Sequence, residues 1–245
     1  MSRYLDVRAV VLGSRPLGEA DRIVVLFTRE AGRIDAVVKG VRKTKSRWGG
    51  RLEPFNVCDL VLFRGRSLAT VTAAEGVAVF PRLRQEREAM IAAALVCEVA
   101  AAIFPEEEPH ERVFNLLCRS LHAFDGGFEG AALEAPVVLG ALIKLLHEAG
   151  FLPVLDECAC CGSGEHAVAF SASRGGLVCG DCSGEGLPAS PGAVEALCDA
   201  LAATLAELRV AEPSPAVAEA VRHLNALVVF QTGTRLRSLR FAGAG

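Results

Sequence analysis

The spacing of apolar residues changes abruptly near Gln85, and this change constrains the fold more than any other feature of the chain. Before it, apolar and β-branched residues form short runs separated by turn residues, which is typical of strands. The five runs are Val7–Leu12, Arg22–Thr28, Arg33–Val38, Phe55–Phe63 and Leu68–Ala73. Five short strands predict a small closed barrel, for which the OB-fold is the commonest solution and an SH3-like barrel is the alternative.

After Gln85 the apolar residues recur at helical spacing. Glu86–Phe104 is apolar on nearly every side, as a central buried helix is, and Pro136–Ala149 has proline in its first turn and Gly150 at its end. Further apolar stripes lie at 113–124, 194–208 and 217–228, the last two behind Ser-Pro pairs that predict helix N-caps. We therefore expect an α+β protein with an OB-fold β-barrel at residues 1–80, followed by an α-helical domain at residues 81–245.

Composition limits the class of protein. Of the 245 residues, 51% are hydrophobic, which is enough to bury a core and argues against disorder. No apolar run approaches the roughly 18 residues of a membrane span. Charges at Arg3, Asp6 and Arg8 interrupt the segment where a signal peptide would have its apolar core. A cytoplasmic protein is expected.

Five of the nine cysteines are clustered. Cys158-x2-Cys161 and Cys179-x2-Cys182 are separated by 17 residues, a spacing typical of a four-cysteine zinc site. Each pair can form a turn that directs both sulfurs at one centre, and four thiolates leave no position for water or substrate. The sequence therefore predicts a structural Zn²⁺ in a finger inserted at about residues 155–187, with a redox dithiol as the alternative.

Two further residues that could bind a metal lie near these pairs, Cys160 and His166. Cys160 is an alternative ligand, although its use would break the two-residue spacing of the first pair. His166 is expected to be a loop residue and not a ligand. The other histidines have no serine, cysteine or paired carboxylate at motif spacing, so no catalytic residue and no enzymatic activity are expected.

Charge divides the chain where the apolar pattern does. Residues 1–84 hold 16 Lys and Arg against 8 Asp and Glu, whereas residues 85–245 hold 10 against 21. The basic half contains an acid-free run with six cations: Lys39, Arg42, Lys43, Lys45, Arg47 and Arg51. Such an asymmetry predicts a polyanionic partner, and nucleic acid is the class that we expect.

Trp48, the single tryptophan, lies within this run. An aromatic ring among cations suits single-strand binding, in which bases stack on the ring and phosphates pair with the cations; the alternative is that the ring anchors its own loop. Arg15, Arg64 and Arg66 lie in other inter-strand segments and are expected to extend the same nucleic-acid surface.

Taken together, these features resemble the RecO family of bacterial recombination mediators. The resemblance spans nearly the whole chain. It is carried by Arg15–Thr28, Gly32, Lys39–Arg47, Leu52–Phe55, Gly150–Pro153, the cysteine pairs with Gly175-Gly176, and Arg237–Phe241. It implies an OB-fold, a helical domain and a zinc finger. It further implies DNA repair by a protein that binds single- and double-stranded DNA, anneals complementary strands and, with RecR, helps RecA to load onto DNA covered by single-stranded-DNA-binding protein.

The resemblance also implies site residues. It places the DNA-contacting loop at Lys39, Arg42, Lys43, Lys45 and Arg47. It places the zinc ligands at Cys158, Cys161, Cys179 and Cys182. Trp48 and Cys160 have no support in the family pattern.

Three rival interpretations stay open from the sequence. An RNA-binding OB-fold protein with a zinc ribbon would carry the same charges. A zinc enzyme is disfavoured because four cysteine ligands leave no open position on the metal. The third interpretation is a protein-interaction adaptor whose basic loop binds an acidic protein tail. Such an adaptor would not bind naked oligonucleotide, whereas a nucleic-acid-binding protein would.

Overall fold

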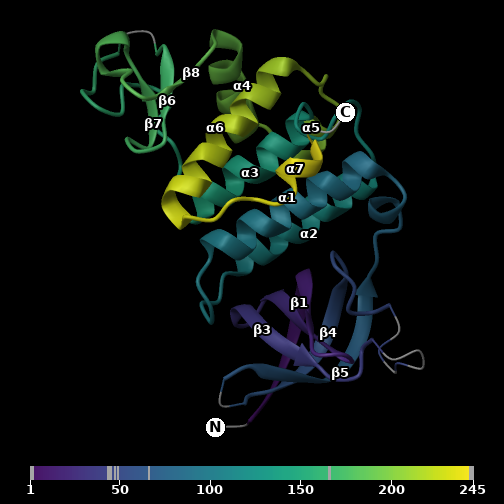
Figure 1. The fold of residues 1–245 in the computed structure, drawn as a ribbon. Coiled ribbons are helices and arrows are strands. Elements are labelled where there is room, and N and C mark those ends of the chain that lie inside the picture. Colours follow the sequence, from purple (N-terminus) through teal and green to yellow (C-terminus); the bar gives the residue numbers. More distant parts are fainter. Residues whose placement is uncertain are drawn as a thin grey trace.

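The computed structural model describes residues 3–42, 46, 48, 50–65, 67–164 and 167–242, and these begin with a closed five-stranded barrel (Figure 1). The strands are β1 (Tyr4–Leu17), β2 (Asp21–Thr28), β3 (Gly32–Val38), β4 (Val57–Phe63) and β5 (Ala69–Ala78). Their order is β1-β2-β3-β5-β4, and pairing of β4 with β1 closes the barrel. Only the β3–β5 contact is parallel. The predicted OB-type barrel is confirmed.

Side chains on the barrel strands alternate between two cores, as the pleat requires. Val7, Ala9 and Val11 of β1 point into the barrel interior. Val10 and Leu12 point outward, into the same apolar cluster as the helices. The barrel and the helical part are therefore joined by a continuous core.

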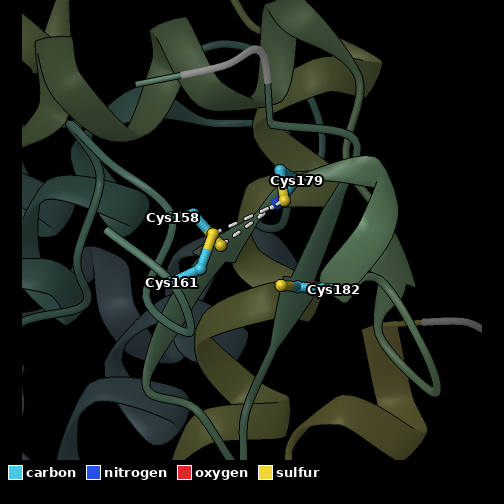
Figure 2. A group of neighbouring side chains, drawn as sticks. All are labelled: Cys158, Cys161, Cys179 and Cys182. Carbon is cyan, nitrogen blue, oxygen red and sulfur yellow. Dashed lines mark hydrogen bonds between the residues drawn. The ribbon is translucent and has the colours of Figure 1, made fainter. Parts of the chain in front are cut away.

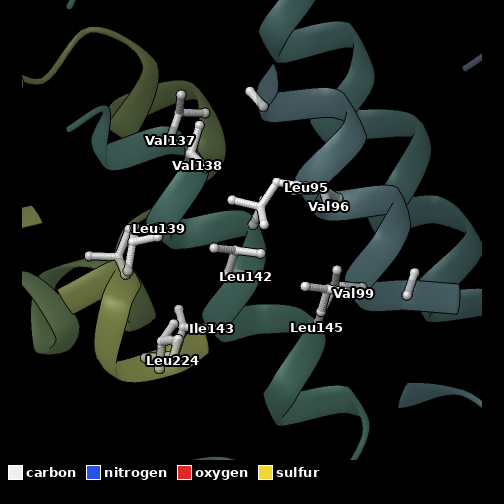
Figure 3. Packing of buried hydrophobic residues seen from close by; sticks show 14 of the residues in the cluster. Leu95, Val96, Val99, Val137, Val138, Leu139, Leu142, Ile143, Leu145 and Leu224 are labelled. Carbon is white, nitrogen blue, oxygen red and sulfur yellow. The ribbon is translucent and has the colours of Figure 1, made fainter. Parts of the chain in front are cut away.

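The helical part of the chain lies against this outward face of the barrel through its first two long helices (Figure 1). It consists of η1 (Arg82–Arg84), α1 (Arg87–Ile103), α2 (Glu111–Asp125), α3 (Pro136–Glu148), α4 (Pro191–Ala202), α5 (Leu205–Arg209), α6 (Pro215–Thr232) and α7 (Leu239–Ala242). α3 packs against α1, α2, α4 and α6, which explains why it is apolar on nearly every side. Figure 3 shows the α1–α3 part of this core, where Leu95, Leu142 and Leu145 are almost fully buried.

One predicted helix is in fact two. The apolar stripe over 194–208 suggests a continuous helix, but α4 ends at Ala202 and α5 begins after Thr204. The Thr204 side chain accepts a hydrogen bond from the Glu207 backbone, and the Glu207 carboxylate accepts one from the Thr204 backbone. This capping box satisfies backbone donors at a new helix start and stabilises the break.

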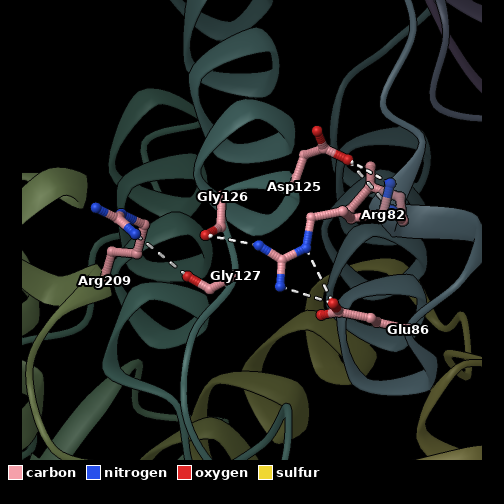
Figure 4. A network of polar contacts seen from close by, with 7 residues as sticks. Arg82, Glu86, Asp125, Gly126, Gly127 and Arg209 are labelled. Atoms are coloured by element: carbon pink, nitrogen blue, oxygen red, sulfur yellow. Dashed lines mark hydrogen bonds and ion pairs between the residues drawn. The ribbon is translucent and has the colours of Figure 1, made fainter.

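The connector after the barrel is fixed to the end of α2 by a polar network (Figure 4). The Asp125 carboxylate accepts hydrogen bonds from the backbone N–H groups of Arg82 and Leu83, at 2.8 and 3.3 Å. The Arg82 guanidinium pairs with Glu86 and also reaches the Gly126 carbonyl. These bonds hold η1, and with it the end of the barrel, in one position relative to the helices.

A small cysteine-rich unit, the finger, lies between α3 and α4 in the sequence. It contains β6 (Ala169–Ser171), β7 (Gly176–Val178), η2 (Gly180–Cys182) and β8 (Leu187–Pro188), with the strands in the order β7-β6-β8. The buried ring of His223 on α6 stacks on Phe170 at 5.1 Å and lies 2.9 Å from the Pro188 carbonyl. Burial lowers the pKa of His223, so a neutral ring anchors the finger to the helices.

None of the described helices is both long and apolar enough to cross a membrane.

Candidate nucleic-acid interface and metal centre

The basic loop, residues 39–51, is anchored by Trp48. The ring is 3% exposed and belongs to the core inside the barrel. Its indole N–H donates a hydrogen bond of 2.9 Å to the Lys39 carbonyl, which joins the two sides of the loop. The prediction that Trp48 stacks on bases is therefore wrong in this structure, because a buried ring offers no free face. The alternative, an anchor for its own loop, is what the structure shows.

Further polar contacts hold both ends of the loop. At its start, the Asp21 carboxylate accepts a hydrogen bond from the Gly40 backbone, and the Arg42 guanidinium reaches the Gly18 carbonyl. At its end, the buried Asn56 amide donates to the carbonyls of Gly50 and Arg51 at 2.8 and 3.1 Å. The loop is thus fixed at its base, while Lys39, Arg42 and Arg51 are exposed.

The other predicted cations are distributed differently. Lys43, Lys45, Arg47, Arg66 and His166 lie outside the described residues. Arg64 is exposed and directly follows β4. Phe63 at the end of β4 and Val37 near the end of β3 both pair with Thr70 of β5. The contact of these cations with nucleic acid stays a prediction.

Arg15 lies on the helix-facing side of the barrel. Its side chain is 61% exposed and forms an ion pair of 3.1 Å with Asp35. It lines a cleft between the barrel and α1. Its contact with nucleic acid stays a prediction.

The four predicted ligands converge in the finger (Figure 2). The sulfur atoms of Cys158, Cys161, Cys179 and Cys182 all lie within 4.8 Å of one another. Sγ of Cys161 is 3.9 Å from Sγ of Cys179. Zn–S bonds of about 2.3 Å place neighbouring sulfurs of a tetrahedron about 3.8 Å apart, so the donor set fits a tetrahedral metal ion.

Local interactions shift the pKa values of two of these thiols in opposite directions. The Cys179 backbone N–H lies 3.4 Å from Sγ of Cys158. This bond, together with the backbone of Cys161 and Cys160, lowers the pKa of Cys158 to about 6, so its thiolate is favoured at neutral pH. The pKa of Cys182 is raised, mainly because its side chain interacts with Cys179. Cys160 is exposed and does not belong to the four-sulfur group.

Comparison with known families identifies the chain. The family model "Recombination protein O N terminal" matches residues 1–80, and the model "Recombination protein O C terminal" matches residues 84–240. The chain belongs to the RecO family. Its relatives include "DNA repair protein RecO" of Rubrobacter xylanophilus, which is 41% identical over 82% of each chain. The protein of the same name from Cutibacterium acnes is 38% identical over 77% of each chain.

The charge balance missed two arginines near the C-terminal end of the described residues. Arg235 and Arg237 line the same cleft as Arg15, although they lie at the other end of the sequence. They lie outside the basic half, so the charge balance of the halves gave no indication of them. The signal that could have found them is the alternation of Arg235, Leu236, Arg237 and Ser238, which is typical of an extended segment with one buried side.

Proposed function

We propose that the chain is a DNA-binding recombination mediator. It binds single- and double-stranded DNA through the basic loop and anneals complementary strands without enzymatic turnover. With RecR, it promotes loading of RecA onto DNA coated by single-stranded-DNA-binding protein. The observation that carries the proposal is an acid-free cationic loop, whose described cations are exposed, fixed to an OB-type barrel in a member of the RecO family. Its place of action would be the cytoplasm, on the nucleoid when bound to DNA.

The chemistry of the loop supports annealing. Two complementary strands repel each other through their phosphates, and a cationic surface lowers this repulsion. Contacts to the phosphates leave the base edges free to pair. The anchors at Trp48 and Asn56 reduce the conformational entropy that the loop loses when it binds.

The central test is strand annealing on oligonucleotides coated with single-stranded-DNA-binding protein, with and without RecR. We expect Lys43→Ala, Lys45→Ala and Arg47→Ala together to abolish annealing while the circular dichroism spectrum stays unchanged. The matched control removes three exposed cations of the helical half, Arg112, Arg174 and Arg222. Equal annealing by both triple variants would reject the loop as the DNA site.

Salt dependence tests the electrostatic basis of binding. Neutralisation of about six phosphates of a single strand predicts a log–log slope of affinity against salt of about −4. The RNA-binding alternative is separated by competition with DNA and RNA strands of matched sequence, since charge alone does not distinguish them. Preference for RNA would favour the alternative, and a slope near zero would remove the electrostatic argument.

We also propose that the finger holds one structural Zn²⁺ ion through Cys158, Cys161, Cys179 and Cys182. The fit of the sulfur distances to a tetrahedron supports this ligand set, and four thiolates are the donors that zinc prefers in closed sites. The ion would hold the finger together and take no part in DNA chemistry.

A further inference from the structure

A cleft of about 550 Å³ lies where the barrel meets the helical layer. One wall is formed by β1 and by the segment that precedes β4, and the other by α1 and residues 234–237. Among the described residues of the basic loop, none lines this cleft.

The segment from Arg235 to Ser238 is built to present arginines to this cleft. Leu236 and Ser238 are buried, whereas Arg235 and Arg237 between and beside them are exposed. Oε2 of Glu98 on α1 accepts hydrogen bonds from the backbone N–H and the hydroxyl of Ser238, at 3.0 and 2.9 Å. This double contact fixes the segment on α1, beside the cleft that Arg235 and Arg237 line.

The charge of the cleft is positive. Four arginines line it, namely Arg15, Arg33, Arg235 and Arg237, and Glu98 is the one acid among its described lining residues. Arg15 and Arg33 are paired with Asp35 and Glu106. Within the described part of the chain, Arg235 and Arg237 have no ion-pair or hydrogen-bonding partner for their guanidinium groups. Two adjacent unpaired guanidinium groups are suited to phosphate oxygens.

An aromatic side chain completes the cleft wall. Phe55 is half-buried, lines the cleft, and has a φ of 75°, a left-handed conformation that is unusual for a bulky residue. Such strain persists where the surrounding structure enforces it, often at ligand sites. Here the Phe55 backbone N–H donates to the Val11 carbonyl at 2.7 Å, which holds the residue in place.

We propose that this cleft binds a second strand of single-stranded nucleic acid. Arg235, Arg237 and Arg15 contact the phosphates, and a base stacks on Phe55. The inference rests on the proposed function, because the basic loop holds the first strand and annealing brings the two together. An aromatic wall beside guanidinium groups favours nucleic acid over an acidic peptide, which would use the charges alone.

The test compares two double variants. The cleft variant carries Arg235→Gln and Arg237→Gln, and the matched control carries Arg222→Gln and Arg240→Gln. Both variants lose the same charge, and Arg222 and Arg240 are exposed but do not line the cleft. We expect the cleft variant to bind one labelled dT20 strand as wild type does, yet to anneal complementary strands at least about tenfold more slowly than the control. Equal annealing rates for the two variants would overturn the inference.

A second measurement follows the base directly. An oligonucleotide carrying 5-iodouracil is irradiated with the full-length chain, and the cross-linked peptide is identified by mass spectrometry. We expect the peptide containing Phe55 in wild type and in the Lys43/Lys45/Arg47 variant, and its loss in the Arg235/Arg237 variant. A cross-link that persists in the Arg235/Arg237 variant would contradict the phosphate contacts.

The outcomes separate this inference from the proposed function. Failure of the loop variant to affect binding or annealing would reject the basic loop, whatever the cleft variant does. A normal loop result with no cross-link at Phe55 would reject the cleft alone. Loss of polyglutamate binding in the Arg235/Arg237 variant, with an annealing rate equal to that of the control, would assign the cleft to an acidic peptide and overturn the proposal.

Discussion

At the scale of single residues, Asn56 shows how a buried polar side chain can organise a charged surface. It is 2% exposed and donates to the carbonyls at the end of the basic loop. Its Oδ1 accepts a hydrogen bond of 3.0 Å from Arg84, which follows the barrel in the sequence. One amide thereby connects the loop with the connector to the helices.

The cysteines give a prediction about metal content. We expect Cys182→Ser to lose most of the bound zinc measured by atomic absorption, because a three-sulfur site lacks the fourth thiolate of the tetrahedron. Cys160→Ser is the matched control, since Cys160 is adjacent in sequence but outside the four-sulfur group, and it should keep one zinc per chain. Loss of zinc in the Cys160 variant instead would show that Cys160 is the ligand.

The same site predicts a dependence on pH. The folded-state pKa of Cys158 is lowered to about 6 from its ordinary value of 9.0, so its thiolate persists as the pH falls to about 6 and is lost below it. Metal binding requires thiolates. We therefore expect zinc retention at pH 7 and release to a chelator as the pH falls through and below about 6. Release that is independent of pH between 7 and 4 would contradict this assignment.

At the scale of elements, the β2–β3 turn is fitted to the α1–α2 connection. Gly32 has a φ of 66°, and a Cβ there would lie 1.8 Å from the Glu108 carbonyl oxygen. The same contact region includes the Arg33–Glu106 ion pair. This close approach explains why glycine is required at this turn.

We expect Gly32→Ala to lower the free energy of unfolding by about 2 kcal/mol or more, from backbone strain together with the clash. Gly18→Ala is the matched control, since Gly18 has a φ of 59° and a Cβ added there would meet no atom within 4 Å. The control should lose about 1 kcal/mol, the cost of the left-handed conformation alone. Denaturant titration measures both, and equal losses would exclude the clash.

Element ends show what the sequence could predict and what it could not. The five strands were predicted, but β1 runs through Gly13 to Leu17 instead of ending at Leu12. Gly13 lies at a register shift between β1 and β2, so it bends the strand where the prediction placed a turn. The Thr204-x2-Glu207 signal for a new helix was present but was masked by the continuing apolar stripe.

The candidate sites follow the same division. Local spacing predicted the four-cysteine cluster, because both cysteine pairs are short-range turns. The burial of Trp48 and the cleft of Arg15 and Arg237 depend on how distant segments pack, which periodicity does not record. These two features therefore follow from tertiary contacts and could not be predicted from charge or composition.

At the scale of the whole molecule, the barrel and the helices share a core. Phe27 of β2 is fully buried and packs edge-on against Phe104, at a ring distance of 5.6 Å. Val10, Leu12 and Val57 of the barrel belong to the same cluster. Separation of the two parts would expose this surface to water, which opposes independent unfolding.

We therefore expect one cooperative unfolding transition. Fluorescence of Trp48 reports on the barrel interior, and circular dichroism at 222 nm reports on the helices. In Phe27→Ala, both signals should shift together, with a loss of about 3–5 kcal/mol. Val77→Ala, at an exposed position, should change stability by less than about 0.5 kcal/mol. Two separated transitions would show that the shared core does not couple the parts.

The contact between Glu98 and Ser238 has a consequence for biosynthesis. The two residues are 140 positions apart, and chains fold from the N-terminal side as the ribosome extends them. The residues of the barrel strands are synthesised long before Ser238. Arg235 and Arg237 join the cleft only near the end of synthesis, so the proposed second-strand site cannot form on a partly synthesised chain.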